Sequence, residues 1–279
     1  MDCLFPLKKV NIKRAVEDYF CLRTEPTDRM TMRQVGNKAT DYFFDSHRAK
    51  VRVSYMSAWE AWHTPEQKEK LEEAAMKLYK TIDLTPAKWR AVLNMRHGAV
   101  SQFKPNIARF LFAFCYPTCI LDPCAGWGGR LLGAMSLDID YIGIDTNTDL
   151  EENYKELIKM YPSGSKIQMY FQDALTMDYS ALEYDMVFTS PPYCSREKYN
   201  KMPKYRNYEE QLIKPLVEKT YKGLSAAGIF AMNVPDYIYL WIKKILGECH
   251  YKMPLLKAKR PPNARGADYK EYIYLWKKE

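Results

Sequence analysis

The stretch Cys119-Ile120-Leu121-Asp122-Pro123-Cys124-Ala125-Gly126-Trp127-Gly128-Gly129-Arg130 joins a short apolar run to a turn rich in glycine. Such a run, bounded by turn residues, is typical of a buried strand, and helical spacing begins after the turn. Glycines allow a backbone to approach a ligand closely. The turn does not match the dinucleotide-binding pattern G-x-G-x-x-G, because position 131 is leucine where the pattern has its third glycine. It also lacks the Lys-Ser/Thr pair of a phosphate-binding loop. It therefore predicts a strand–turn–helix unit that either binds a ligand or only packs the helix on the strand.

Further apolar runs follow this unit, separated by stretches with helical spacing. The runs predict strands at Tyr141–Ile144, Ile167–Phe171, Met186–Thr189 and Ile229–Asn233, in addition to the one at 119–121. Helices are predicted at about Gly129–Met135, Leu150–Met160 and Glu209–Gly223. Alternating strands and helices are typical of a parallel α/β sheet covered on both faces. Two tail strands, about Tyr251–Lys257 and Glu271–Trp276, are joined by a loop too short for a helical crossover, so this pair should be antiparallel.

The first hundred residues show helical patterns instead. Apolar spacing predicts a helix over Val10–Arg23. Thr64 is placed as an N-cap before Pro65, with Gln67 at the capping-box position, and opens a helix to about Lys80. Thr85-Pro86 repeats this start for a helix that ends near Gly98. We expect a helical region over 1–96, with a role in substrate recognition, before a domain over 97–279.

Composition limits the class of protein. The chain has 279 residues and 47% hydrophobic content, which is typical of a globular protein. The longest apolar stretch, 107–121, is interrupted by Arg109 and Pro117, so no membrane span is predicted. No secretory signal is recognisable, which indicates an intracellular, reducing compartment such as the cytoplasm, nucleus or nucleoid. The seven cysteines are irregularly spaced and no histidines pair at ligand spacing, so neither a disulfide framework nor a metal site is predicted.

Three aspartates stand at the ends of successive predicted strands. Asp122 ends the first, Asp145 follows the second and Asp173 follows the third. Ligands of open α/β sheets bind outside the carboxyl ends of the strands. At those places Asp145 could accept both hydroxyls of a ribose and Asp173 an adenine amino group. Singly, each could instead be a helix N-cap.

The fourth strand ends in Thr189-Ser190-Pro191-Pro192-Tyr193, the most specific feature of the chain. With the glycine turn and the aspartates, it resembles the S-adenosylmethionine-dependent amino-methyltransferases, which modify exocyclic amines of nucleobases. The resemblance covers about residues 97 to 276. It implies a Rossmann-like class I methyltransferase fold: a mostly parallel seven-stranded sheet with an antiparallel C-terminal strand, plus the helical N-terminal region.

The resemblance also assigns roles to residues. The catalytic tetrad would be Ser190, Pro191, Pro192 and Tyr193. Asp122, Cys124, Ala125, Gly126 and Gly128 match the loop that cradles the methionine part of the cofactor, and Asp145 and Asp173 match the ribose- and adenine-binding acids. Phe103, Lys104 and Pro105 match a segment that closes over the methionine end.

The chemistry of the tetrad agrees with this assignment. The lone pair of an exocyclic amine is delocalised into the ring, and hydrogen bonds accepted from its N–H groups would relocalise it. Ser190 Oγ and the Pro191 carbonyl can accept them, since two prolines hold a stiff turn without amide hydrogens. Tyr193 would stack on the base, which a duplex must extrude. A covalent cytosine-C5 mechanism needs a Pro-Cys pair after the fourth strand, but Pro123-Cys124 lies on another loop.

Basic residues indicate where a polyanion would pass. The formal charge is +8, with +5 in residues 1–100, −1 in 101–256 and +4 in 257–279. We predict nucleic-acid contacts at two loops. The residues are Arg196, Lys198, Lys201, Lys204 and Arg206 in the first and Lys259, Arg260 and Arg265 in the second. Taken alone, the first cluster could equally be a solvated loop.

Several alternatives remain open at the level of sequence. DNA is favoured as the partner and RNA stays an alternative. In the family that the chain resembles, serine at the first tetrad position is found more often with cytosine N4 than with adenine N6, so the resemblance favours cytosine N4. Methylation of another planar amide or amine, such as a glutamine side chain, and a catalytically silent nucleic-acid-binding subunit are further alternatives; the intact turn and tetrad argue against the silent subunit.

Overall fold

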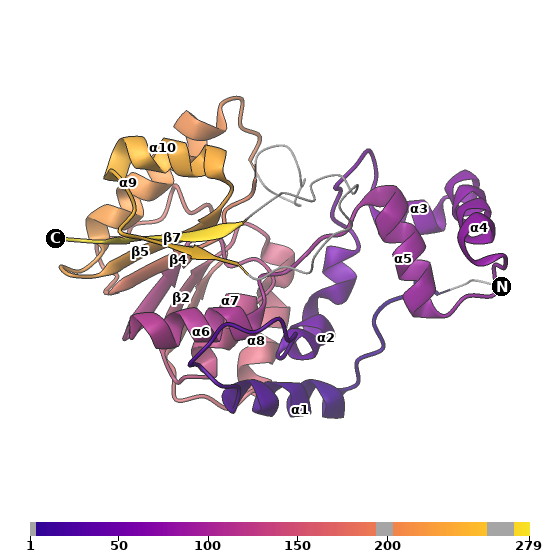
Figure 1. Cartoon of the computed structure of the whole chain (residues 1–279), viewed down its shortest axis with the longest axis horizontal. Coiled ribbons are helices and arrows are strands. Elements are labelled where there is room, and N and C mark those ends of the chain that lie inside the picture. The colour runs from indigo at the N-terminus through magenta and orange to yellow at the C-terminus, as the bar shows by residue number, and fades with distance from the viewer. Residues whose placement is uncertain (1–3, 194–202, 256–270) are drawn as a thin grey trace.

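The computed structural model describes residues 4–193, 203–255 and 271–279, and its centre is a seven-stranded sheet (Figure 1). The strand order is β3-β2-β1-β4-β5-β7-β6, and β7 runs antiparallel to both of its neighbours while the other adjacent pairs are parallel. This confirms the predicted Rossmann-like class I methyltransferase fold and the antiparallel tail pair. The strands are β1 (Cys119–Asp122), β2 (Asp140–Ile144), β3 (Ile167–Tyr170), β4 (Met186–Thr189), β5 (Ile229–Val234), β6 (Tyr251–Pro254) and β7 (Tyr272–Lys277).

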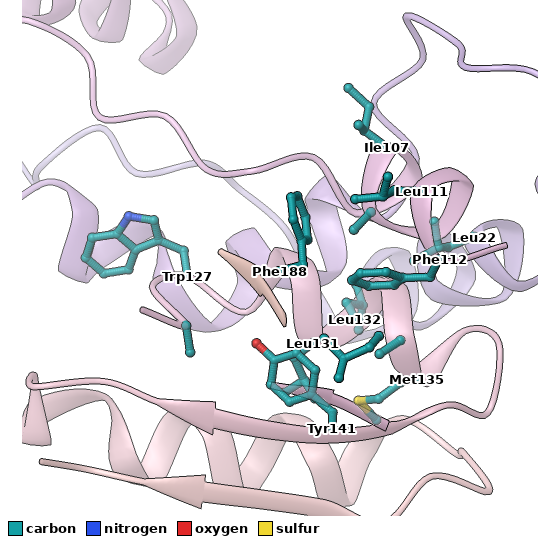
Figure 2. Close-up of a cluster of buried hydrophobic side chains, with 14 of the residues drawn as sticks. Leu22, Ile107, Leu111, Phe112, Trp127, Leu131, Leu132, Met135, Tyr141 and Phe188 are labelled. Carbon is teal, nitrogen blue, oxygen red and sulfur yellow. The ribbon is translucent and has the colours of Figure 1, made fainter. Parts of the chain in front are cut away.

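Successive side chains of the central strands enter opposite cores, as the two-residue period of a strand requires. In β4, Met186 and Phe188 belong to one hydrophobic cluster and Val187 to the other. In Figure 1, α9 and α10 lie along one face, and α6, α7 and α8 lie along the other. Figure 2 shows the second face, where Leu131, Leu132 and Phe112 from the helices meet Tyr141 and Phe188 from the sheet.

Helices at the predicted places are confirmed within one or two residues. These are α1 (Ile12–Arg23), α4 (Pro65–Tyr79), α5 (Pro86–His97), α7 (Gly129–Met135), α8 (Glu151–Met160) and α9 (Lys214–Gly223), which continues a turn of π-helix at Glu209–Ile213. Four further helices were not predicted: α2 (Asn37–Arg48), α3 (Ala58–His63), α6 (Pro105–Cys115) and α10 (Asp236–Leu246). Among the described residues no helix is both long and apolar enough to span a bilayer.

The predicted capping box at Thr64 is wrong, although the helix does start there. The Thr64 hydroxyl donates to the Glu60 carbonyl, and Gln67 accepts from the Tyr55 hydroxyl. The capping box lies one helix earlier, where Ser57 and Glu60 satisfy each other's backbone N–H groups at the start of α3. Thr85 does cap α5 as predicted, with its Oγ1 accepting from Lys88 N.

The helical N-terminal region is divided between two cores. Tyr19 and Leu22 of α1 and Phe44 of α2 are buried in the cluster that covers the sheet. In contrast, α3, α4 and α5 share a smaller core of their own, centred on Trp62 and Trp89, and stand at one end of the molecule in Figure 1. Of these five helices, α1 and α2 therefore pack in the core that covers the sheet, and α3, α4 and α5 do not.

Candidate active site

The buried carboxylate of Asp122 organises the carboxyl edge of the sheet. Its side chain is fully enclosed and accepts four hydrogen bonds. The donors are Arg130 Nε (2.6 Å), Tyr141 OH (2.6 Å), Thr189 Oγ1 (2.8 Å) and Cys124 N (3.3 Å). These donors come from the glycine turn (Cys124), α7 (Arg130), the start of β2 (Tyr141) and the end of β4 (Thr189). Asp122 thus joins four elements by hydrogen bonds and positions the glycine turn through Cys124 N.

The glycine turn is bridged by a tyrosine hydroxyl that the sequence did not predict. Gly126 and Gly128 both have φ near +70°, a conformation that strongly favours glycine. The hydroxyl of Tyr154 on α8 donates to the Gly126 carbonyl and accepts from Gly128 N, each at 3.0 Å. Tyr154 lies at an apolar position of an ordinary helical pattern, so nothing in the sequence marks it as part of the turn.

Asp145 stands next to this turn, half-buried, at the end of β2. Its two carboxylate oxygens accept from Gly126 N at 2.7 Å and from Asn147 N at 2.8 Å. Burial raises the pKa of the Asp145 carboxyl to about 6, and the two backbone hydrogen bonds oppose that rise. Each oxygen keeps a further lone pair, so the group can still accept hydrogen bonds from a ligand.

Asp173 lies after β3, as predicted, and is also half-buried. Its Oδ1 accepts from Leu175 N at 2.9 Å, which makes the local turn, and no hydrogen bond from the described residues reaches Oδ2. The structure adds Tyr205, a residue that the sequence analysis did not select. Burial raises the pKa of the Tyr205 hydroxyl to about 12, and the nearby Asp173 and Cys124 add to the shift. Tyr205 is therefore within electrostatic range of both the third acid and Cys124 of the glycine turn.

The segment 102–105 lies directly against the start of α7. A Cβ added at Gly129 would fall 2.0 Å from the Phe103 carbonyl oxygen. The Phe103 ring meets the Phe188 ring edge-on at 5.2 Å between centroids, and the Arg130 guanidinium lies 5.7 Å from its centre. Lys104 is partly buried, and Pro105 opens α6. The predicted closing segment and the predicted glycine turn are thus neighbours in space.

The position of this segment depends on α2. Oε1 of Gln102 accepts from Thr40 Oγ1 at 2.8 Å and from Arg48 Nη1 at 2.7 Å. Arg48 is itself buried and pairs with Asp41 and Asp45. These buried polar residues explain why α2 escaped prediction, because an inward face made partly of charged residues has no clean apolar period.

Two tetrad residues, Ser190 and Tyr193, lie within hydrogen-bond distance of Asn233, a buried asparagine of β5. The hydroxyls of Ser190 and Tyr193 are 2.7 Å apart. Tyr193 OH lies 2.8 Å from the Asn233 carbonyl oxygen and 3.1 Å from Asn233 Oδ1. Pro191 is buried, and Pro192 is partly exposed. Thr189, the residue before the tetrad, donates to Asp122, so the tetrad and the glycine turn share one hydrogen-bonded edge.

The structure describes two of the eight residues predicted to bind nucleic acid. Lys204 and Arg206 are both exposed and flank the half-buried Tyr205. The other six, Arg196, Lys198, Lys201, Lys259, Arg260 and Arg265, lie outside the described residues.

Cys124, the described cysteine at this edge, is not an activated thiol. Burial raises the pKa of the Cys124 thiol well above its usual range, with the nearby Asp122 and Asp145 charges adding to the shift, so the thiol stays protonated. Within residues 4–193, 203–255 and 271–279, no three His, Cys, Asp or Glu side chains are grouped to hold a metal ion.

Comparisons with known proteins find similarity of fold. No family model and no curated protein matches the sequence. A methyltransferase from Pyrococcus furiosus is 15% identical over 76% of this chain and 95% of that chain, with a TM-score of 0.47. A protein described as a class I S-adenosylmethionine-dependent methyltransferase from Listeria monocytogenes is 13% identical. The match covers 95% of this chain and 88% of that chain, with a TM-score of 0.47. An S-adenosylmethionine-dependent O-methyltransferase from Thermotoga maritima is 13% identical. The match covers 66% of this chain and 69% of that chain, with a TM-score of 0.45.

Proposed function

We propose that this chain is an S-adenosylmethionine-dependent methyltransferase that modifies an exocyclic amine of a nucleobase in DNA, with cytosine N4 favoured over adenine N6. The observation that carries the proposal is the shared carboxyl edge. There the tetrad Ser190 to Tyr193 is joined through Thr189 and Asp122 to the glycine turn, and the turn is bonded to Asp145. A place for a nucleoside cofactor and a place for an amine therefore adjoin.

The residues at the edge fit this cofactor. Asp145 has lone pairs for two ribose hydroxyls, and Asp173 has an oxygen for an adenine amino group. The turn at 124–128 offers backbone groups at close range, with the 103–105 segment beside it. When bound, S-adenosylmethionine would supply a methyl group on a sulfonium. The amine nitrogen would attack the methyl carbon in line, the C–S bonding electrons would return to sulfur to leave the thioether S-adenosylhomocysteine, and the methylated nitrogen would lose one N–H proton to solvent.

The tetrad supplies what the amine needs. Ser190 Oγ and the Pro191 carbonyl would accept from its two N–H groups, so that the nitrogen lone pair is relocalised toward the methyl group. Holding amine and methyl donor in contact replaces a bimolecular encounter and supplies much of the rate. A base within a duplex would have to be extruded to reach this edge, and the Tyr193 ring would stack on it.

Methyl transfer from labelled S-adenosylmethionine tests the proposal. Duplex DNA, single-stranded DNA and RNA are offered in parallel, and the modified nucleoside is identified by mass. We expect methylated cytosine from DNA, lost in Tyr193→Ala and kept in Cys194→Ala. Incorporation only into RNA would move the partner to RNA. The reverse response of the two variants would contradict the mechanism, and binding of nucleic acid without any binding of cofactor would indicate a silent subunit.

Cofactor affinity should depend on pH through Asp145. The pKa of its carboxyl is raised to about 6, so the group loses its charge, and with it the strongest acceptor for the ribose, as pH falls below 6. We expect the cofactor Kd to be flat above pH 7 and to rise about tenfold per pH unit below the pKa. Calorimetric titration with S-adenosylhomocysteine from pH 5 to pH 8 measures this. In Asp145→Asn binding should be weak at every pH, and a pH profile equal to that of the wild type would exclude Asp145.

The salt dependence of nucleic-acid binding tests whether the first predicted nucleic-acid-binding loop, through Lys204 and Arg206, contacts phosphates. If Lys204 and Arg206 contact phosphates, replacing both by alanine should weaken binding and reduce the slope of log K against log salt by about 1.8, at about 0.9 per phosphate contact. Lys155 and Lys159 of α8 form the matched control, because α8 covers a sheet face and Lys155 is already paired with Glu151. If the slope changed equally in both double variants, Lys204 and Arg206 would not be part of the nucleic-acid interface.

A further inference from the structure

The helices α3, α4 and α5, which share the smaller core, differ in charge. Along α4 there are four glutamates and three lysines, a net charge of −1. In contrast, α5 has no acidic residue and three basic ones, Lys88, Arg90 and Arg96. The lack of acids continues beyond this helix, because no Asp or Glu occurs in the sequence between Asp83 and Asp122. A helix of charge +3 therefore leads toward the proposed active site without any carboxylate along the way.

The two faces of α5 have different surroundings. Trp89, Val92 and Leu93 are buried in the smaller core. In Figure 1, α5 lies on the side of the three helices that is turned toward the sheet domain. The side chains that α5 exposes to solvent are those of Ala87, Lys88, Ala91, Asn94, Met95 and Arg96. We call these six residues the α5 face.

The two cations of the α5 face are not neutralised by the described part of the chain. Neither Lys88 nor Arg96 has an ion pair with any described carboxylate. The Lys88 ammonium lies 5.2 Å from the centre of the Tyr79 ring, a contact that leaves its charge in place. Arg90 is different, because it is partly buried and its Nη1 donates to two carbonyl oxygens of the N-terminal segment, at 3.1 Å each. Lys88 and Arg96 are thus the exposed, uncompensated cations of this helix.

A short segment joins α5 to the proposed active site. Gly98 ends the helix, and Phe103 follows five residues later. The Phe103 carbonyl lies against Gly129, and its ring meets that of Phe188, two residues before the tetrad. An extended chain covers at most about 3.6 Å per residue, so Gly98 lies within about 18 Å of Phe103. One turn of duplex DNA is about 34–36 Å long, so a duplex that offers a base to the tetrad can also reach α5.

We propose that the α5 face binds the phosphate backbone of the DNA duplex whose base enters the proposed active site. The inference rests on the proposed function and deepens it, since it names the surface that holds the rest of the duplex. Duplex DNA carries about one negative charge per 1.7 Å of its axis, which attracts uncompensated cations on a face without carboxylates. Ala87 and Ala91 are small enough to let a backbone approach the helix. The Asn94 amide can donate to a phosphate or to a base edge.

The salt dependence of duplex binding tests the proposal. The probe is a fluorescent DNA duplex of random sequence, about three helical turns long. Replacing Lys88 and Arg96 together by alanine should raise its Kd about tenfold and reduce the slope of log K against log salt by about 1.8, at about 0.9 per phosphate contact. The matched control replaces Lys70 and Lys77, which are exposed on α4, and should keep the wild-type Kd and slope.

Both double variants should remain folded. None of the four side chains has an ion pair with a described carboxylate, so we expect thermal unfolding and the Kd of S-adenosylhomocysteine to stay as in the wild type. In the methyl-transfer assay, the α5 variant should raise KM for the duplex and leave kcat unchanged, because α5 contributes no group to the reacting atoms.

A substitution that adds a charge gives a second test. Ala91→Glu places a carboxylate on the α5 face at an exposed position, and glutamate is well tolerated in a helix. We expect the Kd of the duplex to rise at least tenfold, because the carboxylate would repel the phosphates. Met76→Glu, at a position of α4 that is 48% exposed, is the matched control and should bind the duplex as the wild type does.

The possible failures are distinguishable. If the α5 and α4 variants weaken duplex binding equally, or the α5 variants do not weaken it, the α5 face is not the DNA surface. A wild-type chain that binds RNA and no duplex DNA overturns the inference as well. None of these results changes whether the wild type transfers methyl groups to a nucleobase. A chain that binds the duplex through α5 and transfers no methyl group to any nucleobase loses the proposed function and keeps the DNA-binding face.

Discussion

Replacing Asp122 with alanine should remove cofactor binding and lower the free energy of unfolding by about 3–5 kcal/mol, the range found when one partner of a buried ion pair is deleted. The Arg130 guanidinium, 6% exposed, would lose its only carboxylate partner among the described residues, and the Tyr141 and Thr189 hydroxyls would lose their acceptor. The glycine turn would also lose the anchor that Asp122 provides through Cys124 N. Urea unfolding and calorimetric titration with S-adenosylhomocysteine measure the two effects.

Two further variants make this prediction sharper. Thr189→Val deletes a single donor and leaves Asp122 with three, so it should cost only about 1 kcal/mol and give a folded protein in which binding can be measured. Glu151→Ala removes an exposed partner of Lys155 and should change stability by less than about 1 kcal/mol. If Asp122→Ala were no more harmful than Glu151→Ala, Asp122 would not be the centre of this edge.

Gly129→Ala should weaken cofactor binding about a hundredfold or more, although helix propensity alone favours the change by about 1 kcal/mol. The added Cβ would lie 2.0 Å from the Phe103 carbonyl oxygen, and this backbone cannot rotate away as a side chain would. Either the 103–105 segment or the start of α7 must move, and the proposed cofactor site includes residues of the first and of the glycine turn that leads into the second. A displacement of about 1 Å in the groups that position a substrate can lower the reaction rate about a hundredfold, and we expect a comparable loss of cofactor affinity here.

Gly164→Ala is the matched control for this prediction. Its added Cβ would meet nothing closer than 3.5 Å, and its φ is not in the left-handed region. We expect wild-type affinity and stability for Gly164→Ala, measured by the same titration and by thermal unfolding. Equal affinities in the two variants would show that the close approach of Phe103 to Gly129 does not shape the binding site.

The order of helices and strands along the chain was predictable because each is indicated by the residues of its own segment. Short segments of three to seven residues predicted all seven strands, and prolines and N-cap threonines predicted the starts of α4 and α5. The unpredicted helices show the limit of this approach. The inward face of α2 includes Thr40, Asp41 and Arg48, which are tolerated there only because they bond to one another and to Gln102.

The sequence by itself determined the sheet, its glycine turn and the place of the acids and the tetrad at strand ends, since periodicity and turn chemistry are local properties. Only the tertiary structure decided what those residues face. It turned Asp122 inward onto Arg130, left Asp145 half-exposed beside the turn, and set Asn233 against Ser190 and Tyr193. The physical reason is that a buried polar group takes its partner from whichever strand the sheet places alongside. That neighbour depends on strand order and register, which no local stretch of sequence specifies.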